Sequence, residues 1–132
     1  DRKIVYASHS MLRENPGWYF SEQNVNSTLS KSGSIARGID GSDCPFRYAF
    51  SGTEFAVFSN LYGNFRYRFS VDGGEWKEAA FSNHNPTTVV TGLPSGKHSI
   101  SILPIRTDKE STEKEVRISA VMFRDESKQT VR

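Results

Sequence analysis

The chain has 132 residues, a length that predicts one domain with its own hydrophobic core. Its 17 basic and 15 acidic side chains leave a net charge of +2, too small and too dispersed to indicate nucleic acid as a partner. No apolar run approaches the length of a membrane span. The single cysteine, Cys44, excludes a disulfide framework and a multi-cysteine metal site, and we expect it to pack as a small, partly buried residue.

Residues 1–45 combine short β-prone runs with polar loops. Residues 3–7 and 35–39 predict strands, residues 8–16 a loop with at most one helical turn, and residues 21–34 a long loop or weak edge strand. Trp18 and Phe20 would share one face of a strand and Tyr19 the other, because side chains alternate along a strand. Whichever of Trp18 and Tyr19 faces outward is a candidate platform for a ligand. Since the chain starts at Asp1 and not at Met, we expect a fragment or a processed product.

Asp40 and Asp43 flank a polar turn, D-G-S-D, before the next strand. Two carboxylates in a loop are a weak candidate for a structural Ca²⁺ site, because Ca²⁺ takes oxygen ligands from such loops. Their spacing matches no calcium-loop motif, and a plain turn is the simpler interpretation. No other cofactor is indicated.

The segment Asn64–Trp76 is the strongest element of the sequence. Phe65, Tyr67, Phe69 and Val71 alternate with Arg66, Arg68 and Ser70, which predicts a strand with an aromatic inner face and an arginine-bearing outer face. Asp72-Gly73-Gly74 then predicts a tight turn, because Asp and Gly adopt positive φ at low cost. Trp76 opens the return strand.

Similar patterns predict further strands on both sides of this hairpin, at residues 46–50, 54–59, 76–81, 87–91, 97–105 and 116–124. About eight short strands joined by turns, without an amphipathic helix, indicate an all-β antiparallel sandwich or barrel. Residues 125–132 are expected to form a tail or a linker.

Four motifs follow one another in the second half of the chain: F-S-G-T-E-F at 50–55, V-D-G-G at 71–74, L-P-S-G-K-H-S-I-S-I at 93–102 and I-S-A-V at 118–121. Their order resembles the galactose-binding-like jelly rolls that accompany glycoside hydrolases and GDSL-type esterases and occur on phage tails and fibres. The resemblance covers residues 46–124 and leaves residues 1–45 poorly matched. It implies a jelly-roll β-sandwich over 1–132 and a carbohydrate-binding role.

Catalytic motifs are absent from the sequence. There is no G-x-S-x-G elbow, no Gly-Asp-Ser block and no H-E-x-x-H, and the three histidines have no metal-ligand spacing. Glu75 and Glu78 form an acid pair, but exposed strand carboxylates are common. His98 has no acid or thiol beside it in the sequence, so we expect a structural, hydrogen-bonded ring. The domain itself is therefore predicted not to be an enzyme.

Sugars present apolar C–H faces and many hydroxyl groups, so a sugar site combines an exposed aromatic ring with a few polar side chains. Besides Trp18 and Tyr19, the candidates are Tyr62 with Asn60 and Asn64, Trp76 beside Glu75, and Asn83, His84 and Asn85. Tyr62, in a turn, is the aromatic residue expected to be most exposed. Burial in the core is the alternative for each tryptophan.

Arginines offer a second candidate surface. Arg66 and Arg68 share the outer face of their strand, and Arg47 faces outward from its own strand by the same alternation. If these strands are neighbours, the three arginines form a cluster suited to an anionic glycan or a teichoic-acid-like polymer. A solvated face paired with glutamates is the plainer alternative.

Together, the motifs and the missing catalytic set predict a lectin-like module that targets a larger enzyme or fibre to a glycan or cell-surface polysaccharide, outside the cell or on a virion. One alternative is an assembly or receptor-binding module of a phage tail or fibre, with a second copy of the chain or a neighbouring domain as partner. Another is the accessory domain of a GDSL-type esterase.

Overall fold

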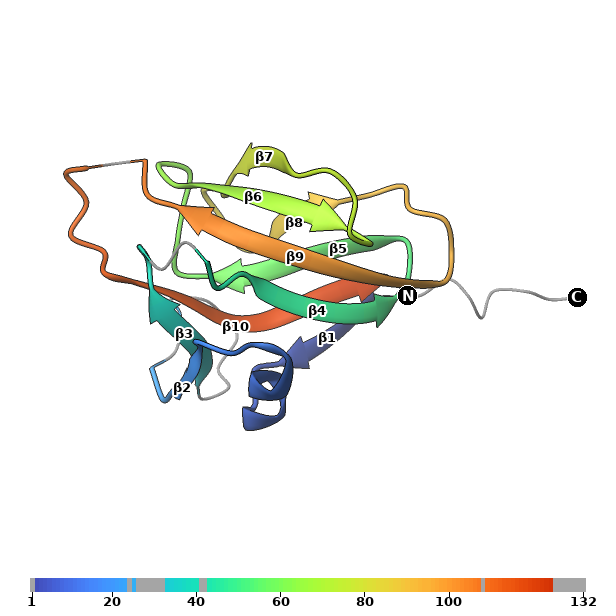
Figure 1. Ribbon diagram of the computed structural model, residues 1–132, viewed down its shortest axis with the longest axis horizontal. Helices are drawn as coiled ribbons and strands as arrows, with labels where there is room; N and C mark the ends of the chain where they lie inside the picture. The colour runs from blue at the N-terminus through green and yellow to red at the C-terminus, as the bar shows by residue number, and fades with distance from the viewer. Residues whose placement is uncertain (1, 24, 26–32, 41–42, 108, 125–132) are drawn as a thin grey trace, which may run out of the picture.

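The computed structural model describes residues 2–23, 25, 33–40, 43–107 and 109–124. This part of the chain contains ten strands, more than the eight or so expected, and one short 3₁₀ helix (Figure 1). They are β1 (Arg2–Tyr6), η1 (His9–Glu14), β2 (Tyr19–Ser21), β3 (Ser34–Gly38), β4 (Phe46–Ser51), β5 (Glu54–Ser59), β6 (Arg66–Val71), β7 (Lys77–Ala80), β8 (Thr87–Val90), β9 (Lys97–Ile105) and β10 (Glu115–Arg124). The expected tail at 125–132 and most of the expected loop after β2 lie outside the described residues.

Two antiparallel sheets form a sandwich. One sheet has the order β2-β3-β10-β5-β8, and β1 also pairs with β10. The long strand β10 pairs with β5 along one edge, while its other edge pairs with β3 near its start and with β1 near its end. The second sheet has the order β4-β9-β6-β7, which leaves β4 as an edge strand. The antiparallel β-sandwich predicted from the sequence is therefore confirmed.

The predicted central hairpin is confirmed, with two differences. β6 pairs with β7, and Tyr67 on its inner face is fully buried while Arg68 on its outer face is exposed. Trp76, expected to open the return strand, lies one residue before β7, and Ser70, expected on the outer face, is buried. In the turn, Asp72 and Gly73 both have positive φ, 53° and 72°. The Gly74 N–H donates to the Val71 carbonyl at 2.9 Å, which closes a two-residue turn of the kind that matches the twist of the strands.

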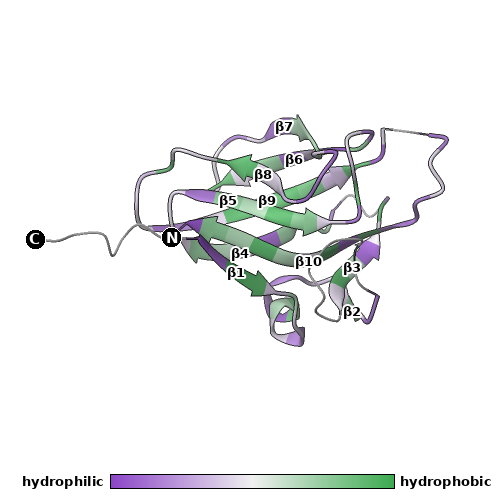
Figure 2. Ribbon diagram, turned by 180° about the vertical axis from the view of Figure 1, so that it is seen from behind, coloured by the Kyte–Doolittle hydropathy of each residue, from purple (hydrophilic) through white to green (hydrophobic). Residues whose placement is uncertain are grey.

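A shared hydrophobic core fills the space between the sheets. Both sheets contribute aromatic and β-branched side chains to it, among them Phe46, Phe55, Tyr67, Ile102 and Val121. Figure 2 shows hydrophobic residues along the central strands and hydrophilic residues in the connecting loops. Burial also raises the pKa of Tyr67 to about 12, because a phenolate would be poorly solvated there. Among the described residues, no helix is long and apolar enough to cross a membrane.

The connections gather at the two ends of the sandwich. The β5–β6 and β7–β8 loops lie at one end, and the β6–β7 turn lies at the opposite end (Figure 1). At one side of the sandwich, η1 packs against the edge strand β4 and against β2 and β3. The helical turn falls within the segment where the sequence allowed one. The loop end and the β4 edge each carry a cavity.

Candidate functional site

The loop end brings together residues that the sequence placed in two separate candidate groups. Tyr62 from the β5–β6 loop and Asn83, His84 and Asn85 from the β7–β8 loop line one open pocket of about 380 Å³. We call this the loop pocket. Its volume lies within the range of roughly 300–1,000 Å³ that is usual for small-molecule sites.

Gly63 and Asn83 hold the two loops together. The Gly63 N–H donates to Asn83 Oδ1 at 3.2 Å. A Cβ on Gly63 would lie too close to that same oxygen, so any larger residue would displace the Asn83 side chain. Gly63 thus lets the side-chain amide of Asn83 sit at the pocket.

Several groups in the loop pocket are available to a ligand. Tyr62 is half-buried, less exposed than the sequence led us to expect, and His84 is exposed. Within the part of the chain that the structure describes, no hydrogen bond involves the Tyr62 hydroxyl or the His84 ring. An aromatic ring beside an amide and an imidazole can contact the C–H face of a sugar and exchange hydrogen bonds with its hydroxyl groups.

Two of the predicted asparagines instead hold the fold together. Asn85 Nδ2 donates to the Ser59 carbonyl at 2.9 Å, and the Ser59 N–H donates to Asn85 Oδ1 at 3.1 Å. Asn60 does the same for β10, donating to the Glu115 carbonyl at 2.9 Å and accepting from the Arg117 N–H at 2.7 Å. Both amides bind backbone groups that a neighbouring strand would otherwise bind. Their own polar atoms are therefore engaged within the fold.

Asn64 is neither a pocket residue nor one of these structural asparagines. It follows Gly63 in the sequence and is exposed, and its backbone carbonyl accepts a hydrogen bond from Thr107 Oγ1 at 2.8 Å. Its contact ties the β5–β6 loop to the chain segment that follows β9. The structure places Asn64 outside the lining of the loop pocket.

The two tryptophans have opposite environments. Trp18 is only 7% exposed, its Nε1 donates to the Cys44 carbonyl at 3.0 Å, and the Arg37 guanidinium lies 5.3 Å from its ring centroid. It therefore belongs to the core, while Tyr19 on the other face is 45% exposed and its hydroxyl donates to Glu115. Cys44 is half-buried, as expected.

Trp76 is 48% exposed and lies beside Glu75 just before β7. β7 and its flanking residues separate it from Asn83, so the tryptophan sits at the turn end of the hairpin and the loop pocket at the other end. The structure therefore does not bring these two candidate groups together.

The three predicted arginines do not lie on neighbouring strands. Arg66 and Arg68 both pair with Glu78, at 2.7 Å and 3.7 Å, and the Arg66 hydrogen bond is the main cause that lowers the pKa of Glu78. Arg47 lies on β4, and β9 stands between it and β6. Arg66 and Arg68 therefore match the plainer alternative, a surface whose arginines are paired with a glutamate.

Asp40 and Asp43, the weak calcium candidates, belong to no metal-binding group among the residues that the structure describes. Asp40 Oδ1 accepts from Arg106 Nε at 3.1 Å. The described ranges contain no group of three or more His, Cys, Asp or Glu side chains placed to hold a metal ion. Neither carboxylate enters the loop pocket.

His98 and Asp72 form an acid–histidine pair at the turn end. His98 Nδ1 lies 2.7 Å from Asp72 Oδ2, and His98 Nε2 lies 2.6 Å from the Pro94 carbonyl oxygen. The Pro94 carbonyl and then Asp72 raise the pKa of His98, while the hydrogen bond from His98 lowers the pKa of Asp72. Because both ring nitrogens already face acceptors, the ring fastens the β6–β7 turn to the β8–β9 turn, the structural role predicted from the sequence.

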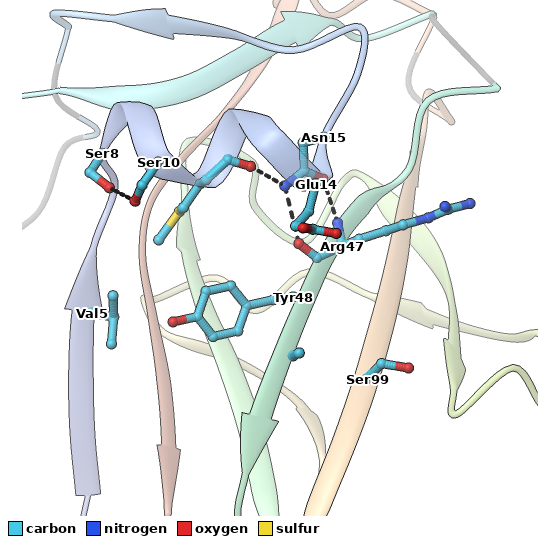
Figure 3. Close-up of a pocket in the computed structure, with 10 residues that line it drawn as sticks. Val5, Ser8, Ser10, Glu14, Asn15, Arg47, Tyr48 and Ser99 are labelled. Carbon is cyan, nitrogen blue, oxygen red and sulfur yellow. Dashed lines mark hydrogen bonds between the residues drawn. The ribbon is translucent and has the colours of Figure 1, made fainter.

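A second cavity, of about 520 Å³, lies at the edge of β4. Its walls come from β1, η1, β4 and β9, and include Val5, Met11, Glu14 and Tyr48 (Figure 3). We call it the edge cavity. Sequence reasoning missed it, apart from Arg47 on its rim, because its residues come from four segments that no local pattern connects.

Comparisons with known proteins identify the fold. No protein-family model and no curated protein matches the chain. Among solved structures, a family two carbohydrate esterase from Cellvibrio japonicus matches 93% of the chain with a TM-score of 0.56 at 13% identity. A family two carbohydrate esterase from Clostridium thermocellum, in complex with cellohexaose, matches 90% with a TM-score of 0.51 at 19% identity.

A third structure, the exo-beta-1,3-galactanase of Phanerochaete chrysosporium with galactose, matches 92% of the chain with a TM-score of 0.52 at 12% identity. The chain spans 33%, 30% and 29% of the length of these three proteins, so it corresponds to one part of each. At such identities the likeness shows the fold alone. The chain has the galactose-binding-like β-sandwich fold that its sequence motifs implied.

Proposed function

We propose that the chain is a non-catalytic carbohydrate-binding domain that accompanies a carbohydrate-active enzyme and binds a glycan in the loop pocket. One observation carries the proposal: two loops, fixed to each other by Gly63 and Asn83, present the Tyr62 ring and the His84 imidazole in one open pocket. This combination supplies an apolar wall and a few hydrogen-bonding groups, which is what a sugar requires.

The fold supports the association with an enzyme. Each solved structure described above is a carbohydrate-active enzyme, and the chain corresponds to about a third of it. The esterase matches favour the accessory domain of an esterase over the assembly module of a phage tail or fibre, for which the comparisons offer no support. A secreted location follows from this proposal, because polysaccharide substrates lie outside the cell.

The nature of the pocket groups favours a neutral glycan. Among the described residues, no lysine, arginine, aspartate or glutamate lines the loop pocket. The arginines of β6, which would suit an anionic polymer, are paired with Glu78 on another part of the surface. We therefore expect hydroxyl-rich, uncharged sugars to bind more tightly than uronic acids or phosphate-bearing polymers.

A glycan microarray of neutral and anionic polysaccharides, probed with the 132-residue chain, tests the proposal. We expect binding to neutral glycans that is lost in Tyr62→Ala and weakened in His84→Ala. Trp76→Ala is the matched control, since Trp76 is an exposed aromatic residue at the opposite end of the hairpin. A blank array, or binding that Trp76→Ala removes and Tyr62→Ala leaves intact, would overturn the proposal.

A further inference from the structure

The edge cavity borders a strand edge whose backbone is only partly occupied. β4 pairs with β9 on one side and, in the part of the chain that the structure describes, with no strand on the other. Near the start of β4, Asn15 replaces the missing strand: the Arg47 N–H donates to Asn15 Oδ1 at 2.6 Å, and Asn15 Nδ2 donates to the Arg47 carbonyl at 3.1 Å (Figure 3). The backbone groups of Arg47 therefore point away from β9.

Two residues further along β4, Ala49 points its own backbone groups toward the same edge. Ala49 lies opposite Ser99, and the Ser99 N–H and carbonyl are bonded to Asp72 on the far side of β9, at 2.8 Å each. Ala49 and Ser99 are thus a pair without mutual hydrogen bonds, as alternate pairs in an antiparallel ladder are. The Ala49 N–H and carbonyl face outward, and among the described residues neither has a partner.

The edge cavity opens at this unpaired position. Ala49 contributes to its lining, together with the apolar side chains of Val5 and Met11. Tyr48 lies below η1 with its ring in the cavity (Figure 3), and within the described residues no hydrogen bond involves its hydroxyl. The cavity thus combines an apolar wall, an aromatic ring, a phenol and a side-by-side backbone donor and acceptor.

We infer that the edge cavity is a second sugar-binding site, in which two neighbouring hydroxyl groups of a pyranose pair with the Ala49 backbone. One hydroxyl oxygen accepts from the Ala49 N–H, and the adjacent hydroxyl donates to the Ala49 carbonyl, as the Asn15 amide does at Arg47. The C–H face of the sugar packs against Met11 and the Tyr48 ring, and the Tyr48 hydroxyl binds a further sugar oxygen.

A small ligand fits this edge better than an added peptide strand. Strand addition draws its affinity from a row of main-chain hydrogen bonds. Here Asn15 and η1 close the edge at Arg47, and the β4–β5 turn follows soon after Ala49, since β4 ends at Ser51. The inference rests on the proposed function in one respect, namely that the ligand of this domain is a carbohydrate.

Nuclear magnetic resonance titration of the ¹⁵N-labelled chain tests the inference. The probes are the methyl glycosides of glucose, galactose, xylose and mannose, each at millimolar concentration. We expect at least one to shift the Ala49 amide resonance, in the parent chain and equally in Tyr62→Ala. Shifts confined to Gly63 and Asn83 would overturn the second site while leaving the loop pocket in place.

Ala49→Pro removes the backbone donor without removing a ladder hydrogen bond, because that N–H faces outward and proline is tolerated at such edge positions. We expect affinity at the edge cavity, followed by the Phe50 amide, to fall about tenfold, the equivalent of one hydrogen bond. Ala49→Ser keeps the donor and serves as the control. Equal affinity in the two variants would overturn the inference.

Tyr48→Phe provides the test if Ala49→Pro does not fold. It removes the phenol and keeps the ring, so binding at the edge cavity is expected to weaken several-fold. Unchanged affinity in Tyr48→Phe would contradict the assigned contact.

Discussion

Asn15 is predicted to stabilise the fold far more than a loop asparagine ordinarily would. It is 1% exposed, and its amide makes three hydrogen bonds: two with the backbone of Arg47 and one, at 2.9 Å, with the Met11 carbonyl. At a net value of about 1 kcal/mol per hydrogen bond, Asn15→Ala should lower the free energy of unfolding by about 3 kcal/mol.

That loss would be large beside a total stability of roughly 5–15 kcal/mol for a typical domain. Urea unfolding followed by circular dichroism measures it, as a shift of the midpoint at constant slope. Asn83→Ala is the matched control, since Asn83 is exposed and should lose less than about 1 kcal/mol. If Asn15→Ala and Asn83→Ala cost the same, the assigned role of Asn15 as a strand substitute is wrong.

Two further predictions concern the turn end and the loop pocket. The Pro94 carbonyl, and then Asp72, raise the pKa of His98, so the protonated ring stabilises the fold. This stabilisation is fully present at pH below about 6 and is lost as the pH rises through the raised pKa. The stability difference between the parent and His98→Gln, measured by urea unfolding across pH, should therefore shrink in alkali; a constant difference would refute it. Gly63→Ala should displace Asn83 and weaken glycan binding by about tenfold or more, with calorimetry as the measurement; unchanged affinity would refute the role of this contact.

The β6–β7 hairpin shows what the sequence could predict. Alternation of aromatic and arginine residues defines a two-residue period, and Asp72-Gly73 supplies the positive φ that the turn needs. Both signals are local, so they survive without knowledge of the tertiary structure. The same local alternation separated the exposed Tyr19 from the buried Trp18.

The roles of the asparagines could not be predicted from the sequence. Asn60 and Asn85 were candidates for ligand binding, but their amides pair with backbone groups as many as 57 residues away in the chain. Nothing in the neighbouring sequence distinguishes such an amide from one that faces a pocket. Asn15 was not a candidate at all, although it anchors η1 beside the edge cavity.

The two cavities also differ in how far the sequence could predict them. The sequence could predict the separate residues of the loop pocket, because aromatic and amide residues in turns are visible in it. It could not predict that Tyr62 and His84 line the same pocket. The edge cavity depends on which strand lies at an edge and on which backbone groups face outward. These are properties of sheet order, and sheet order is set by contacts between distant segments.

The most direct test of the central claim is a calorimetric titration of Tyr62→Ala, beside the parent chain and Trp76→Ala, with the glycan that binds the parent best. We predict that Tyr62→Ala loses measurable affinity while Trp76→Ala keeps the affinity of the parent. Full affinity in Tyr62→Ala would contradict the claim that the loop pocket is the glycan-binding site of this domain.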